Sequence, residues 1–279
     1  MTLPRVCLLL TLSLAALGAA RAADSALSLS GARTQGGLLL GETLPGAEVF
    51  LDQKPVAVSP EGRFLVGFGR EAAPMATLRV LLPDGREFLE PLEIARRDYQ
   101  IQRIDGLPQS MVTPPEEVLK RIADDNAKVA AARAVALTET LYASGFVWPA
   151  LGPVSGVYGS QRILNGEPRQ PHYGVDVAAP RGTPVVAPAD GLVTLAERDL
   201  YYTGGTIILD HGYRLSSTLM HLDSVTVAVG QRVEQGEQVG TLGATGRATG
   251  PHLDWRMNWF EERIDPALLA GPMPESGTN

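Results

Sequence analysis

Residues 204–222 read GGTIILDHGYRLSSTLMHL, and this stretch indicates the fold. Two short apolar runs, 206–210 and 215–220, are candidate strands, and His211-Gly212 between them is typical of a turn. Further candidates, separated by Gly-containing turn sequences, lie at 184–187, 192–195, 225–229 and 238–242. Short strands at this spacing predict a compact all-β domain over residues 144–270.

The region before this domain is predicted to contain a β module and a linker. Short alternating apolar runs within residues 23–100 are separated by Pro- and Gly-containing turns, which favours a small β-sandwich. This module has no histidine, so we interpret it as a spacer or docking module. Residues 101–143 are predicted to form a linker with a helix, capped by Thr113 and Glu116 and running to about residue 143. The predicted fold class is therefore mainly β, with an N-terminal β-sandwich-like module, a linker helix and a C-terminal all-β domain.

The two ends of the chain are predicted to lie outside these modules. Residues 1–22 combine Arg5, a short apolar run at 8–17 and a small-residue cleavage site, which predicts a signal peptide. We therefore expect an exported protein with no stable membrane span after cleavage. The periplasm is the favoured location, and release from the cell is the alternative that the sequence leaves open. Residues 271–279 lack apolar periodicity and are predicted to be a loose tail.

Composition excludes several function classes. The single cysteine, Cys7, lies inside the predicted signal peptide, so the exported chain has neither disulfide nor thiol chemistry. Without Arg5 and Arg21, the 24 Lys and Arg fall to 22 against 31 Asp and Glu, a formal charge of −9. No basic run is present, which argues against nucleic acid or anionic lipid as a partner.

All four histidines fall within residues 144–270, and three of them occur in suggestive patterns. His172 and Asp176 are four apart, so on an extended strand both side chains leave the same face. The same argument places His252 and Asp254 on one face of a strand. His221 ends the strand predicted at 215–220. Alone, each pattern is weak evidence for a metal or proton-transfer site, and His211 is interpreted as a structural turn residue.

In combination, these patterns are more specific. The segment from Gly152 to Pro266, about 40% of the chain, resembles the lysostaphin/LytM-type zinc metallopeptidases that cut peptidoglycan peptides. The motifs that carry the resemblance are YGSQR (158–162), HYGVD (172–176), PRGTPV (180–185), APADG (187–191), MHL (220–222), VGQRV (229–233), GATG (243–246) and GPHL (250–253).

The resemblance implies a role for each matched residue. His172 and Asp176 match the first two zinc ligands, and His221 and His252 match the pair that moves protons and steadies the oxyanion. The family's third zinc ligand is a histidine, and here that position is Asp254. Aspartate is an acceptable zinc ligand, although two carboxylates are expected to neutralise the ion, weaken it as a Lewis acid and favour Mn²⁺ or Fe²⁺ more than usual.

The implied function is metal-dependent hydrolysis of peptide bonds in peptidoglycan. Arg181 and Arg247 are candidates to meet acidic stem peptides, and Tyr173, Tyr201 and Tyr202 are candidates to line the groove. The alternative is a catalytically impaired domain that binds and regulates other cell-wall hydrolases or division proteins, and Asp254 keeps this alternative open. A biotin- or lipoyl-carrying domain is excluded because residues 144–270 contain no lysine.

Overall fold

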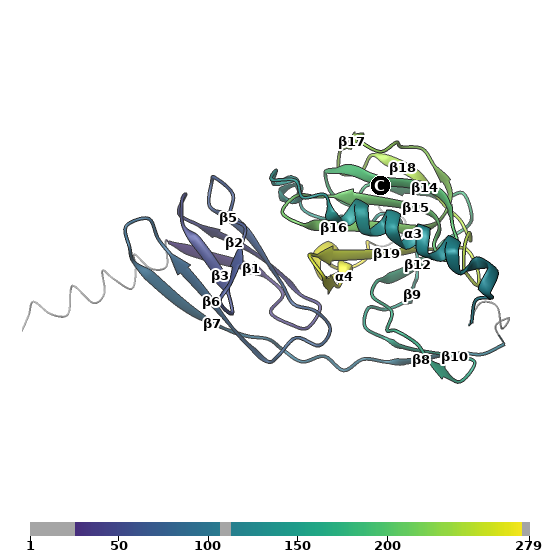
Figure 1. Cartoon of the computed structure of the whole chain (residues 1–279), viewed down its shortest axis with the longest axis horizontal. Coiled ribbons are helices and arrows are strands. Elements are labelled where there is room, and N and C mark those ends of the chain that lie inside the picture. The colour runs from purple at the N-terminus through teal and green to yellow at the C-terminus, as the bar shows by residue number, and fades with distance from the viewer. Residues whose placement is uncertain (1–25, 107–112, 275–279) are drawn as a thin grey trace, which may run out of the picture.

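The structure is a computed structural model of the chain and describes residues 26–106 and 113–274. The signal peptide predicted for residues 1–22 lies outside this range, as does the end of the predicted tail. No helix within the described residues has the length and apolar character needed to cross a membrane. The described strands form four sheets, which confirms the predicted mainly β fold (Figure 1).

Two small antiparallel sheets make up the N-terminal module (Figure 1). One has the order β1-β2-β5 and the other β4-β3-β6-β7. The strands alternate in burial, as in β6, and side chains such as Phe64, Leu78 and Leu92 are buried in the core. The strands are β1 (Leu27–Gly31), β2 (Leu38–Thr43), β3 (Glu48–Leu51), β4 (Lys54–Val56), β5 (Arg63–Gly67), β6 (Met75–Leu81) and β7 (Glu87–Glu93).

A sheet of ten strands forms the C-terminal domain, with the central order β17-β14-β15-β16-β19-β12-β9. Its middle strands are buried along nearly their whole length, because other elements cover both faces. The prediction of a separate strand at 225–229 is wrong, because Val225 is the last residue of β16 and, among the described residues, no strand follows it before β17. The strands are β9 (Val154–Gly156), β12 (Val175–Ala178), β13 (Pro184–Val186), β14 (Gly191–Leu200), β15 (Gly204–Asp210), β16 (Leu215–Val225), β17 (Arg232–Val233), β18 (Gln238–Leu242), β19 (His252–Trp259) and β20 (Glu262–Ile264). A short helix, α4 (Pro266–Ala270), follows β20.

The linker contains a strand that the sequence analysis did not predict. β8 (Ile101–Ile104) pairs in parallel with β10 (Gln161–Leu164), which also pairs with β11 (Glu167–Pro168). This small sheet brings the linker against the segment that leads into β12. A parallel partner from distant sequence leaves no local turn signal, so this pairing was not visible in the pattern.

The linker helix α3 (Glu116–Ala134) is shorter than predicted and is not capped as predicted. It begins after Pro115, which supplies no side-chain cap, so the cap assigned to Thr113 is wrong. It ends at Ala134 because the next residues bond to the turn between β15 and β16, with the amide of Leu137 donating to Asp210 at 3.1 Å. A 3₁₀ turn, η1 (Leu141–Ser144), completes the connection. Figure 1 shows α3 lying across the sheet, where Val129 and Ala132 pack on Leu195 and Ile208.

Candidate metal centre

The candidate site is built on two neighbouring antiparallel strands, β12 and β19. Their register places Asp176 directly opposite Asp254 and Ala178 opposite His252. Both carboxylates are buried, with Asp176 6% exposed and Asp254 1% exposed. Two like charges in this arrangement repel each other and lose hydration, so the pair requires positive charge from other groups.

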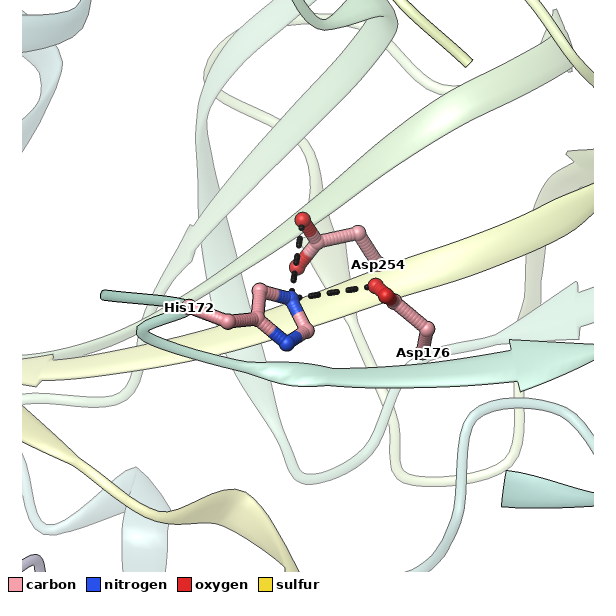
Figure 2. A group of neighbouring side chains, drawn as sticks. All are labelled: His172, Asp176 and Asp254. Carbon is pink, nitrogen blue, oxygen red and sulfur yellow. Dashed lines mark ion pairs between the residues drawn. The ribbon is translucent and has the colours of Figure 1, made fainter. Parts of the chain in front are cut away.

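His172 completes a group of three converging side chains (Figure 2). Its Nε2 lies 3.1 Å from Oδ1 of Asp176 and 3.4 Å from Oδ2 of Asp254. One ligand atom from each residue lies within 4.8 Å of the other two. Among the described residues, His172 Nε2 and Asp176 Oδ1 are buried without a hydrogen-bond partner. Unpartnered buried polar atoms are rare, and one imidazole with two carboxylates is a suitable donor set for a divalent cation, so these residues fit a metal ion.

The structure places His172 differently from the sequence argument. His172 and Asp176 do converge, but His172 lies in the loop before β12, so strand alternation is not the cause. The loop passes close to β19 at Gly174, where a Cβ would lie 2.6 Å from the carbonyl oxygen of Trp255 and 2.7 Å from Oδ1 of Asp254. Glycine at 174 therefore allows the close approach that brings His172 over the two carboxylates.

Two arginines that the sequence analysis missed pair with the two carboxylates. Arg256 donates through Nη2 to Oδ2 of Asp254 at 2.7 Å and through Nε to Oδ1 at 3.1 Å. Arg162 on β10 donates through Nη2 to Oδ2 of Asp176 at 3.1 Å. Arg256 follows Asp254 by two residues, and this even spacing on a strand was the available signal. Arg162 left no comparable signal, because its contact crosses between strands.

These pairs change the charge of the site. Burial raises the pKa of Asp254, but the charges of Arg256 and His172 outweigh burial and hold this pKa well below its usual range. Asp254 is therefore ionised, and its charge is offset by a guanidinium. Each carboxylate thus has an arginine partner that offsets part of its charge, so a bound divalent ion would meet less negative charge than two unpaired carboxylates provide.

His221 and His252 lie beside this group with their ring centroids 4.7 Å apart. Nδ1 of His221 lies 2.8 Å from the carbonyl oxygen of Thr245, and Nδ1 of His252 lies 2.8 Å from that of Gly250. A carbonyl oxygen only accepts, so we assign the proton of each neutral ring to Nδ1 and the free lone pair to Nε2. Burial lowers the pKa of His221 and so favours its neutral form.

His221 has an unusual backbone conformation. It lies in β16 with φ of 63°, in the left-handed region that non-glycine residues rarely adopt. The register of β15 against β16 shifts here, between Gly205 and Ile207, and the His221 amide donates instead to the Thr203 carbonyl at 2.8 Å. This irregularity turns the His221 ring toward His252, a side-chain redirection that bulges commonly produce near functional sites.

A groove of about 700 Å³ opens over the site. Its lining includes His221, His252 and Asp176, and also Tyr173 and Tyr202. Four arginines line it, at positions 162, 169, 247 and 256, which concentrates positive charge in a chain whose formal net charge is −7. The groove is therefore suited to an anionic ligand.

Two other candidate residues, and the fourth histidine, lie away from this groove. Arg181 is largely exposed and pairs with Asp223, and Tyr201 lines a different cavity. His211 is buried, with Nδ1 2.7 Å from the carbonyl oxygen of Asp190 and Nε2 2.8 Å from Oγ of Ser217. Both ring nitrogens of His211 are thus satisfied, in agreement with its interpretation as a structural residue.

Comparison with known proteins identifies the family. Residues 170–266 match peptidase family M23. A family M23 protein of known structure from Pseudomonas aeruginosa is 31% identical, over 86% of this chain and 95% of that one, with a TM-score of 0.65. The chain belongs to peptidase family M23. This confirms the resemblance to lysostaphin/LytM-type metallopeptidases that the sequence motifs predicted.

Curated relatives match the M23 chain over a smaller part of its length. The Vibrio cholerae protein named peptidoglycan DD-endopeptidase ShyA is 40% identical over 31% of this chain and 20% of its own length. The Caulobacter vibrioides cell division protein DipM is 34% identical over 49% of this chain and 23% of its own length. The M23 chain thus spans less than a quarter of either relative.

Proposed function

We propose that the chain is a metal-dependent endopeptidase that hydrolyses peptide bonds in peptidoglycan, with His172, Asp176 and Asp254 as the metal ligands. One observation carries this proposal. His172 Nε2 and Asp176 Oδ1 are buried, lack hydrogen-bond partners among the described residues and face the Asp254 carboxylate. The relative named peptidoglycan DD-endopeptidase supports the choice of substrate.

Zinc is the proposed metal, with Mn²⁺ or Fe²⁺ as alternatives that the two carboxylate ligands favour. When bound, such an ion supplies a Lewis acid and lowers the pKa of a coordinated water. His221 and His252 each present a free Nε2 because a carbonyl oxygen holds the Nδ1 proton. Either ring is therefore able to accept a proton from water and to return one to the leaving amine.

The charge of the groove supports an acidic peptide as the substrate. Stem peptides carry carboxylates, and Arg169 and Arg247 lie in the groove lining with Arg162 and Arg256. An exported, periplasmic protein would meet this substrate in the cell wall. Division proteins or other cell-wall hydrolases are proposed partners, since one relative is named a cell division protein.

The experiment separates metal binding from proton transfer. Metal content of the purified chain is measured by mass spectrometry, and hydrolysis of purified murein is followed by chromatography. We expect the wild-type chain to hold one metal ion and His172→Ala to lose both metal and activity. His221→Ala, the matched control, is expected to keep the metal and lose activity about 100-fold or more.

Two outcomes would reject the endopeptidase proposal. A wild-type chain that binds no metal and cleaves no murein would favour the regulatory alternative, in which the domain binds other hydrolases. Full activity of His172→Ala would show that the chemistry lies elsewhere.

A further inference from the structure

A second cavity lies beneath α3, on the other side of Arg256 from the groove. Its volume is about 150 Å³, and its lining includes Arg133 from α3, Arg256 from β19 and Arg263 from β20. Thr203 and Thr218 add hydroxyl groups to the same lining. Arg256 lines both cavities, so it connects the candidate metal centre to this second space.

Two of the three arginines at this cavity, Arg133 and Arg263, have no acidic hydrogen-bond partner among the described residues. Arg133 donates through Nη2 to Oγ1 of Thr218 at 3.2 Å, while its buried Nε has no hydrogen-bond partner among residues 26–106 and 113–274. Burial, together with the charges of Arg263 and Arg256, lowers the pKa of Arg133 to about 9, and the charge of Glu261 acts in the opposite direction. Burial and Arg256 also lower the pKa of Arg263. Arg133 and Arg263 therefore lie close enough to Arg256 for its charge to disfavour theirs, whereas, against the effect of burial, Asp254 raises the pKa of Arg256 itself.

Of two carboxylates near the cavity, one already pairs with a cavity arginine. Asp254 accepts from Nε and Nη2 of Arg256. Asp125 lines the cavity, but its Oδ2 accepts from the backbone amide of Tyr201 at 2.7 Å. Arg263 donates to a neutral group, Oδ1 of Asn258, at 2.9 Å. An added anion would offset the charges of Arg133 and Arg263, whose side-chain hydrogen bonds within the described residues are to neutral groups.

We propose that this cavity binds a small inorganic oxyanion of the size and charge of sulfate or phosphate, between Arg133, Arg256 and Arg263. Guanidinium groups present several N–H donors in a planar fork, which several oxygen acceptors on one ion satisfy better than a monatomic anion does. Asp254 occupies Nε and Nη2 of Arg256, and within the described residues no hydrogen bond involves its Nη1. The buried Nε of Arg133 supplies a further unused donor.

The anion also affects the candidate metal centre. It shares Arg256 with Asp254, so the guanidinium holds that carboxylate less strongly and leaves more of its negative charge for a cation. Groups that contact metal ligands tune metal affinity in this way, and linkage requires that the anion and the metal strengthen each other's binding. This second step rests on the proposed metal site, whereas binding of the anion does not.

Thermal unfolding of the metal-free full-length chain tests the anion site. Unfolding is measured in sodium sulfate and in sodium chloride at equal ionic strength, for wild type, Arg133→Gln and the control Arg121→Gln. Arg121 lies on the same helix and pairs with Asp199 at the surface. Sulfate stabilises proteins in general, so the specific effect is the difference between variants. We expect a saturable extra rise of about 5 °C in wild type and Arg121→Gln, and none in Arg133→Gln.

Equal sulfate effects in wild type and Arg133→Gln would overturn the site. If Arg133→Gln does not fold, Arg263→Gln replaces it with the same expected loss. The coupling is tested by chelator competition for zinc with and without sulfate, where we expect wild type to bind zinc about five-fold more tightly with sulfate. A sulfate effect on unfolding with unchanged zinc affinity would overturn the coupling. Absence of zinc binding in every sample would count against the proposed function and not against the anion cavity.

Discussion

At the scale of single residues, the pairing of Asp254 with Arg256 predicts what happens when Asp254 is replaced by histidine, the residue that the sequence resemblance implies for this position. Asp254→His alone removes the carboxylate that pairs with Arg256, whose side chain is 26% exposed. An imidazole, neutral or protonated, then lies beside the guanidinium in place of an anion. We expect a loss of about 2 kcal/mol in the free energy of unfolding, because a partly buried charge is left unpaired.

The double variant Asp254→His with Arg256→Leu is the matched comparison. It removes both charges together, so we expect most of the lost stability to return. Urea unfolding of wild type, both single variants and the double variant gives the coupling energy between the two positions. Additive effects would show that Asp254 and Arg256 do not stabilise each other.

A second residue, His211, predicts how stability depends on pH. Burial lowers its pKa in the folded chain from 6.5 to about 4, so only the unfolded chain takes up the proton between these values. The contribution of His211 to the free energy of unfolding is therefore fully present above pH 6.5. It is lost as the pH falls toward 4, by up to about 3 kcal/mol. His211→Gln is expected to reduce this slope in urea unfolding at pH 7, 6 and 5. An identical slope in the variant would contradict the assignment.

At the scale of elements, the loop before β12 depends on glycine at position 174. Gly174→Ala introduces a Cβ 2.6 Å from a β19 carbonyl oxygen, and neither backbone is free to move without shifting the sheet. We expect a loss of about 1–3 kcal/mol in unfolding free energy and metal binding weakened about 10-fold. Gly250→Ala is the stability control, because a Cβ there meets nothing within 4 Å. Equal unfolding of both variants would contradict the close approach.

The elements also show how far the sequence predicts this site. Alternation along β19 placed His252 and Asp254 on one face, because an isolated strand carries its own periodicity. The convergence of His172 was expected for the wrong reason, since its loop is positioned by contact with β19. Arg162 reaches Asp176 from β10, and β10 is itself paired with β8, about 60 residues earlier in the chain, so no local pattern encodes this placement. Packing across elements therefore decides the charge of the site, while local spacing accounts only for His252 and Asp254 sharing one face of β19.

At the scale of the whole molecule, the two modules meet at a buried carboxylate, Asp265. Its side chain is 4% exposed and accepts from Nη1 of Arg97 at 2.8 Å, and its amide donates to the Gly36 carbonyl at 2.7 Å. Nearby, Trp259 and Ile264 lie against Gly67 of β5, where even a single Cβ would come within 2.9 Å of them. This contact couples the N-terminal module to β19 and β20, the strands that continue from the candidate metal centre.

Arg97→Met tests whether this junction makes the two modules unfold together. The change leaves Asp265 buried without its guanidinium, and we expect a cost of about 2 kcal/mol because Arg97 itself is partly exposed. All three tryptophans lie in the C-terminal domain, so fluorescence reports that domain while circular dichroism reports both. We expect the two signals to coincide in urea unfolding of wild type and of the control Arg96→Met, and to separate in Arg97→Met. Coincident transitions in Arg97→Met, at an unchanged midpoint, would show that the modules are coupled by their apolar contacts and not by this ion pair.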